Sequence, residues 1–277
     1  TQYGVRLIAD LAFSPRSTGA VGLDLHRQAH YFSEAHRARA RGDFNNDMDI
    51  QNFGVFLEYN QTLKERARLR SGLRFDRQTT AYHNALFHNA MGRRTRDLIP
   101  GSASEHAVSG FVRYERDVVQ KPLTFYVGVG HAERPADYWE AFKTWEANSN
   151  RSRGQTAAPS EARPAREKNT QIDLGWVYAG EKENASLSLY CAHISDFILR
   201  QPTGAYGNVN ARLYGLEAEY TRTVSPHWTL GASLAYTRGD DRTNRAALPQ
   251  IAPLEANLTA KYQHGKGEAN LICRLVS

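Results

Sequence analysis

Apolar and polar residues alternate along stretches of about ten positions, and this period of two restricts the fold more than any other feature. One such stretch runs from Tyr214 to Tyr220, where Glu217 and Glu219 separate apolar and aromatic residues. A second runs from Trp228 to Tyr236 with the same alternation. Successive side chains of a β-strand point to opposite faces, so each stretch predicts a strand with one apolar face.

The connections between these stretches alternate strictly between short and long. Short turns such as 14–17 and 264–267 follow the odd-numbered strands, and long polar segments, notably 31–50, 79–105 and 134–167, follow the even-numbered ones. Outer-membrane barrels have short periplasmic turns and long external loops, whereas a soluble sandwich does not sort its loops by end. We therefore predict an all-β, antiparallel up-and-down transmembrane β-barrel, with a soluble all-β domain as the alternative. The twelve predicted strands lie near 3–13, 20–30, 51–61, 67–78, 106–116, 122–133, 168–179, 185–197, 209–222, 227–238, 251–263 and 268–276.

Composition is consistent with a membrane span built from strands. No run of about 18 apolar residues is present, so any span must be β. Cys191 and Cys273 lie in separate predicted strands, and their spacing assembles neither a disulfide framework nor a zinc site. Aromatic residues near the short turns predict a girdle at the periplasmic interface: Tyr59, Trp176, Tyr178, Trp228 and Tyr262.

The basic excess is concentrated in the long connections. The chain has 35 Lys and Arg against 29 Asp and Glu, a net charge of +6. On an external face, such arginines would meet the phosphates of lipopolysaccharide, which a guanidinium binds through two hydrogen bonds. Ordinary solvated loops are the alternative, and nucleic acid is disfavoured because no aromatic stacking platform accompanies the clusters. The arginines are Arg37, Arg39, Arg41, Arg93, Arg94, Arg96, Arg151, Arg153, Arg163 and Arg166.

Both ends of the chain suggest part of a larger barrel. No signal peptide precedes the first predicted strand, and the last one ends at Ser277 without an aromatic terminal residue. Two open sheet edges would not be tolerated in a bilayer. We therefore expect residues 1–277 to be one portion of a barrel domain, with further segments on both sides.

Four segments of the second half resemble the TonB-dependent outer-membrane receptors. Residues 128–140 are similar to the segment after a central strand, and 164–175 resemble the pattern P-E-K-x-x-x-x-E-x-G. Residues 208–219 match N-x-x-x-x-x-x-G-x-E, and 248–253 resemble L-P-x-x-P. Residues 138–140 together with 187–198 are most similar to the copper receptors of this family.

The resemblance implies a transport machine in the bacterial outer membrane. It implies a barrel of about 22 strands, of which this chain supplies about 12, around an N-terminal plug. A segment outside residues 1–277 would couple the receptor to the TonB complex. The implied function is import of copper or a metal complex, with copper as cargo and no resident cofactor. A siderophore receptor, a passive porin-like barrel and an outer-membrane hydrolase are the alternatives.

One loop carries a candidate set of metal ligands. His83, His88 and Met91 have the spacing H-x4-H-x2-M, and copper binds imidazole and thioether groups. This spacing is no established metal motif, so chance is the competing explanation. The resemblance places the receptors' principal metal ligands outside this chain, which leaves these residues at most a secondary contact.

No catalytic motif is present. The chain lacks G-x-S-x-G, H-E-x-x-H, a P-loop and a complete G-x-G-x-x-G. His131, Glu133 and Asp137 lie at a predicted strand top, where barrel hydrolases hold their catalytic groups, but they also lie in a segment that resembles the receptors. We therefore predict that the protein is not an enzyme.

Overall fold

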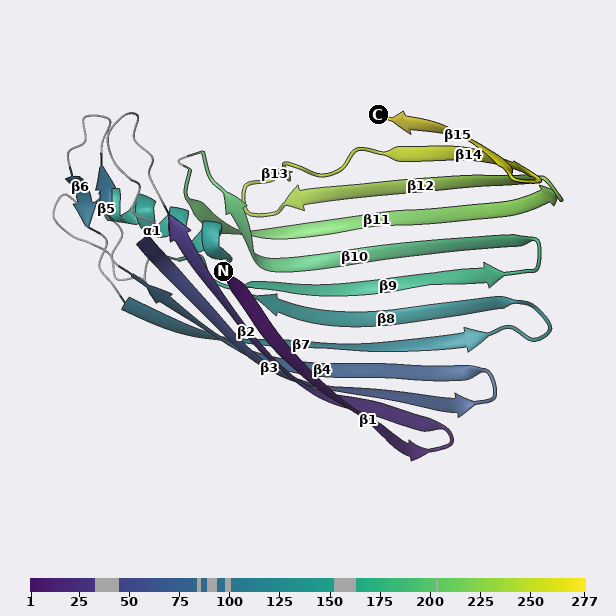
Figure 1. Ribbon diagram of the computed structural model, residues 1–277, viewed down its shortest axis with the longest axis horizontal. Coiled ribbons are helices and arrows are strands. Elements are labelled where there is room, and N and C mark those ends of the chain that lie inside the picture. The colour runs from purple at the N-terminus through teal and green to yellow at the C-terminus, as the bar shows by residue number, and fades with distance from the viewer. Residues whose placement is uncertain (33–44, 84–85, 89–93, 98–100, 152–162, 203) are drawn as a thin grey trace.

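Twelve long strands form one antiparallel sheet in which each strand pairs with its neighbours in sequence (Figure 1). The computed structural model describes residues 1–32, 45–83, 86–88, 94–97, 101–151, 163–202 and 204–277. The predicted number and order of the long strands are confirmed. They are β1 (Gln2–Ser14), β2 (Ser17–Phe32), β3 (Asn45–Lys64), β4 (Ala67–Tyr82), β7 (Gly101–Asp117), β8 (Leu123–Arg134), β9 (Glu167–Ala179), β10 (Glu183–Arg200), β11 (Tyr206–Ser225), β12 (Trp228–Asp241), β14 (Glu255–His264) and β15 (Gly267–Val276).

The long connections contain short elements that the period of two did not predict. A helix, α1 (Tyr138–Arg151), follows β8 at the loop end of the sheet (Figure 1). Strands β5 (Leu86–His88) and β6 (Arg94–Asp97) form a separate hairpin, and β13 (Ala246–Ala247) pairs with β12. Within the described part of the chain, no helix is long and apolar enough to cross a membrane.

The register confirms that one face of the sheet is apolar. Val127 of β8 pairs with Leu174 of β9, and Val129 pairs with Ile172, so these four side chains share a face. All four are about half exposed, as expected for groups that contact lipid. The opposite face is polar and carries Arg70, Arg74, Asp173, Glu217 and Glu219.

The polar face is concave. Tyr190 of β10 shares a 2.6 Å hydrogen bond with Thr237 of β12, above Gly215 of the intervening strand. Neighbouring strands lie about 4.8 Å apart, so alternate strands are separated by about twice that distance on a flat sheet. Tyr190 reaches Thr237 because its side chain is long and Gly215 has no side chain in between, and Figure 1 shows the sheet bent into an arc. The sheet is thus an arc of barrel wall with polar residues inside.

The sheet is open at both edges. Among the described strands, β1 pairs only with β2 and β15 only with β14. At the turn end, the ring centroids of Trp228 and Tyr262 lie 4.9 Å apart on the apolar face. Phe13 and Tyr59 form a similar pair near the first two turns, at 5.9 Å. Aromatic rings therefore border the apolar band at this end, as predicted for an interfacial girdle.

Candidate functional site: the polar wall and its external end

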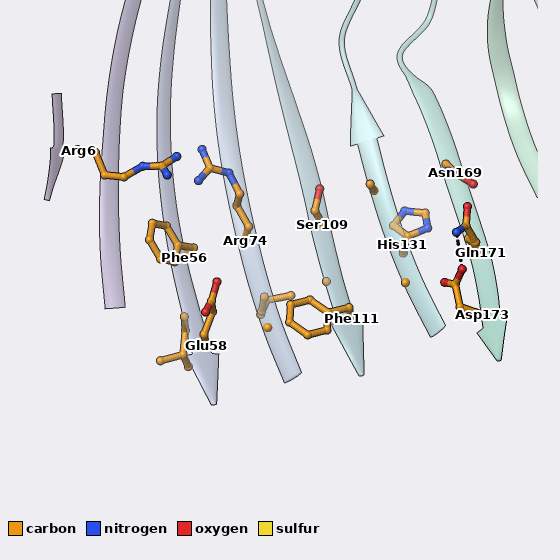
Figure 2. A pocket seen from close by; sticks show the side chains of 16 residues that line it. Arg6, Phe56, Glu58, Arg74, Ser109, Phe111, His131, Asn169, Gln171 and Asp173 are labelled. Carbon is orange, nitrogen blue, oxygen red and sulfur yellow. Dashed lines mark hydrogen bonds between the residues drawn. The ribbon is translucent and has the colours of Figure 1, made fainter. Parts of the chain in front are cut away.

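A depression of about 460 Å³ lies on the polar face and is lined by residues of β1, β3, β4, β7, β8 and β9. Figure 2 shows the guanidinium groups of Arg6 and Arg74 approaching each other above Phe56. Phe111 lies on the floor, and on β9 Gln171 donates a 2.7 Å hydrogen bond to Asp173. The depression therefore combines charged groups on one side with an aromatic floor.

The charged groups of this wall form one connected network. Arg6 donates to Asp24 at 2.6 Å, and Arg74 donates to the same carboxylate at 2.5 Å. Arg74 also donates to both oxygens of Asp76, each at 2.7 Å. The side chains of Asp24, Asp76 and Arg74 are 13%, 16% and 29% exposed, so water screens the contacts of Arg74 less than those of the exposed Arg6. Two arginines and two carboxylates balance in charge and hold each other in place.

A glycine makes room for the network. Gly54 of β3 lies between Asp24 and Asp76 in the register. A Cβ atom at this position would lie 2.3 Å from Nη2 of Arg74 and 2.5 Å from Oδ1 of Asp76. Only a residue without a side chain lets Arg74 cross the strand between its two carboxylates.

A second depression, of about 390 Å³, continues the polar wall toward the loops. Arg74 borders both depressions, and the upper one ends at Asp137 and Tyr138, where α1 begins. Amide side chains of Asn52 and Gln78 line it between these limits. The wall thus presents a polar path from its centre to its external end.

Helix α1 begins with a reciprocal capping arrangement. Asp137 accepts a 2.8 Å hydrogen bond from the backbone N–H of Glu140, and Glu140 accepts one of 2.8 Å from the N–H of Asp137. Arg134 donates to both oxygens of Glu140, at 2.8 and 3.0 Å. Thr144 donates to the carbonyl of Glu140 and accepts from the N–H of Tyr206 at 3.1 Å. The spacing D-x-x-E at residues 137–140 could have indicated this helix, which was not predicted from the sequence.

An apolar cluster attaches α1 to the wall. Phe142 and Tyr138 pack with Met48, Tyr82 and Ile198, so β3, β4 and β10 meet the helix. Met48 and Phe142 are fully buried, and Met48 therefore acts as packing rather than as an accessible thioether.

A histidine joins this cluster on the polar face. The ring of His30 stacks on that of Tyr138 with centroids 3.7 Å apart. His30 is the register partner of Met48, although a bulge follows it. The contact joins residues more than a hundred positions apart, so local pattern did not reveal it.

The predicted ligand set is only partly described. Nε2 of His83 lies 3.2 Å from Oδ2 of Asp49. The register places the side chain of Asp49 on the apolar face, whereas that of Met48 lies on the polar face. The side chain of His88 and all of Met91 lie outside the described residues. No group of three His, Cys, Asp or Glu in the described part is arranged to hold a metal ion.

The residues considered for catalysis have structural contacts instead. Nδ1 of His131 lies 2.9 Å from Oγ1 of Thr170, and Glu133 accepts a 3.0 Å hydrogen bond from the N–H of Val108. Asp137 caps α1. Each of the three residues thus has a structural contact within the wall or at the start of α1.

The structure describes the side chains of only some of the arginines in the long connections. Arg163 lies 3.2 Å from Glu105, and Arg166 lies 3.1 Å from Glu133, so both are paired. The side chains of Arg94, Arg96 and Arg151 are not described, and the remaining loop arginines lie outside the described residues: Arg37, Arg39, Arg41, Arg93 and Arg153.

Comparison with known proteins identifies this architecture. The family model "TonB dependent receptor-like, beta-barrel" matches residues 1–271. The copper transporter OprC is 31% identical over 100% of this chain, with a TM-score of 0.85, and the match covers 44% of OprC.

Receptors for iron complexes share the fold at lower identity. The ferric-catecholate import receptor Fiu from E. coli K12 is 10% identical, and the ferric yersiniabactin uptake receptor FyuA from Yersinia pestis is 15% identical. Each covers 99% of this chain, with TM-scores of 0.69 and 0.65, and the matches span 44% and 42% of those proteins. No curated protein matches the sequence. The chain spans less than half the length of the three solved structures.

Proposed function

Because this chain belongs to the TonB-dependent receptors and forms part of their β-barrel, we propose that it is part of the wall of a transporter that imports copper or a copper complex. Its family places it in the outer membrane of Gram-negative bacteria. The observation that carries the copper proposal is the whole-length likeness to the copper transporter OprC, at 31% identity against 10% and 15% for Fiu and FyuA.

Further strands would close the barrel around the polar wall. Among the strands that the structure describes, β1 and β15 each pair on one side only, and a bilayer does not tolerate open sheet edges. A barrel of about 22 strands encloses a lumen too wide to select its cargo, so a plug would fill it. Coupling of that plug to the TonB complex would then drive release of the cargo.

The polar wall suits contact with a plug better than capture of a metal ion. Asp24 and Asp76 are already paired with arginine, so neither offers a free carboxylate to a cation. A balanced, weakly screened network keeps its geometry while a plug moves past it. The principal metal ligands would then lie outside residues 1–277, with His83, His88 and Met91 as a secondary contact at the loop end.

Uptake by cells tests the cargo. Cells that produce the complete receptor should accumulate copper faster than cells that lack it, and removal of TonB should abolish the difference. Ferric siderophore uptake, measured in the same strains, is the control for the alternative cargo. TonB-dependent uptake of a ferric siderophore without any effect on copper would overturn the copper proposal.

A loop deletion tests the location of the metal site. Deleting residues 83–91 from the complete receptor should weaken copper binding modestly in calorimetry, because only a secondary contact is lost. Complete loss of binding would place the principal site in this loop.

The external loops, and the part of the apolar face nearest the loop end, would contact lipopolysaccharide. In the outer membrane, the end of the barrel with the long loops faces the leaflet that contains this phosphorylated glycolipid.

A further inference from the structure

A groove of about 520 Å³ lies on the apolar face, near the loop end of β1 to β4. Val5, Leu25 and Phe53 are neighbours in one cross-strand row and form its apolar floor. Arg27 and Thr79 border it in the next row toward the loops, on either side of Gln51. The groove therefore combines an apolar base with a polar rim where the membrane-facing surface meets the external side.

Arg77 places a positive charge on this rim without a protein counterion. It is the register partner of Phe53, so it extends the apolar row of the floor by one strand. Its side chain is exposed, and no described carboxylate forms an ion pair with it. Arg74, on the same strand but the polar face, contacts two carboxylates. An unpaired guanidinium beside an apolar surface favours an anion from outside the protein.

Two neighbouring side chains, Arg27 and His106, extend the polar rim. Nη1 of Arg27 donates to the hydroxyl of Tyr3 at 3.1 Å, and Nη2 lies 3.4 Å from Asp49, so this guanidinium is positioned with its side chain 43% exposed. His106 is the register partner of Arg77, and its ring stacks on Phe75 at 5.4 Å. Arg77 and His106 lie on β4 and β7, away from the open edge at β1.

We propose that this groove binds the phosphorylated headgroup of lipopolysaccharide. A headgroup phosphate contacts Arg77 and the rim beside Arg27, and the first part of an acyl chain lies on Leu25 and Phe53. Guanidinium matches phosphate through two parallel hydrogen bonds, and basic pockets at a membrane surface bind lipid headgroups in this way. The proposal rests on the outer-membrane placement in the proposed function, and it does not depend on the cargo.

Lipid retained by the purified protein tests the proposal. The complete receptor is purified from outer membranes in mild detergent, and bound lipopolysaccharide is measured by mass spectrometry. Arg77→Gln should reduce the retained amount about fivefold, because one basic residue at a charged membrane surface contributes about that factor. Arg116→Gln is the matched control: Arg116 is also exposed on the apolar face, without a described carboxylate partner, but lies at the turn end. It should leave retention unchanged.

A lipid variant gives a second test without any mutation. Wild-type receptor in detergent is offered phosphorylated lipid A or lipid A without phosphates, and the phosphorylated form should be retained in excess. Equal retention of the two forms, or equal retention by wild type and Arg77→Gln, would overturn the proposal. So would retention of phosphatidylethanolamine in place of lipid A.

Uptake separates this proposal from the proposed function. Arg77→Gln should transport copper at the wild-type rate, because Arg77 faces away from the lumen. If wild-type cells show no copper uptake, the cargo proposal fails while the lipid measurements still stand.

Discussion

Tyr190 and Thr237 share a 2.6 Å hydrogen bond above Gly215, although their strands, β10 and β12, are not neighbours. A Cβ atom on Gly215 would lie 2.2 Å from the carbonyl oxygen of Tyr236 and 2.6 Å from the Tyr190 hydroxyl. Backbone oxygen cannot move aside as a flexible side chain does. The close approach of the Tyr190 side chain and of the Tyr236 backbone at this point therefore depends on the absence of a side chain at position 215.

Substituting Gly215 tests this dependence. Gly215→Ala should lower the free energy of unfolding by about 1–3 kcal/mol, the usual cost of overpacking. Tyr190→Phe removes only the hydrogen bond and should cost about 0.5–1.5 kcal/mol. Urea unfolding of the receptor in lipid vesicles measures both values. Wild-type stability for Gly215→Ala would show that the strands separate without strain.

The charged network of the polar wall gives a second prediction. Arg74→Met leaves Asp76 without its arginine while Asp24 keeps Arg6, and we expect a loss of about 1–2 kcal/mol in unfolding free energy. Arg70→Met is the control on the same strand and face, because Arg70 is 53% exposed and lies 3.8 Å from Glu115. Its effect should stay below about 0.5 kcal/mol. Equal losses from the two variants would show that the network adds nothing beyond an exposed ion pair.

The assignment of faces gives a third prediction. Val127→Lys places a charge on the lipid-facing surface and should cost about 2–4 kcal/mol if Val127 lies near the midplane. Ser188→Lys adds the same charge on the polar face beside Glu217 and should change stability little. Unfolding and yield of folded receptor in vesicles measure the difference. The reverse order of effects would mean that the two faces are exchanged.

The start of α1 gives a fourth prediction. Glu140→Ala removes both the capping hydrogen bond and the ion pair with Arg134, so residues 138–151 should exchange their amide hydrogens faster. Asp137→Asn keeps a side-chain oxygen that accepts the Glu140 N–H and should change exchange only slightly. Unchanged exchange in Glu140→Ala would show that the apolar contacts of Phe142 alone hold the helix.

The sequence by itself determined the strands, their order and their faces. In a strand the direction of a side chain depends only on whether its position is odd or even, and short turns oblige neighbouring strands to pair. The capping pair Asp137 and Glu140 is also local, so the spacing of these two residues could have predicted the start of α1. The period-two pattern missed it because a helix within a long polar loop does not alternate.

Only the tertiary structure decided which charged groups meet. Arg74 and Arg77 are three positions apart on one strand, yet Arg74 contacts Asp24, fifty residues away, while Arg77 has no described carboxylate partner. Odd and even positions face opposite sides of the sheet, so Arg74 and Arg77 have different neighbours. Side chains of alternate strands converge on the concave face, where arginine finds carboxylates of the same chain. They diverge on the convex face, where Arg77 meets no described carboxylate and Arg27 reaches only one, that of Asp49 on the neighbouring strand.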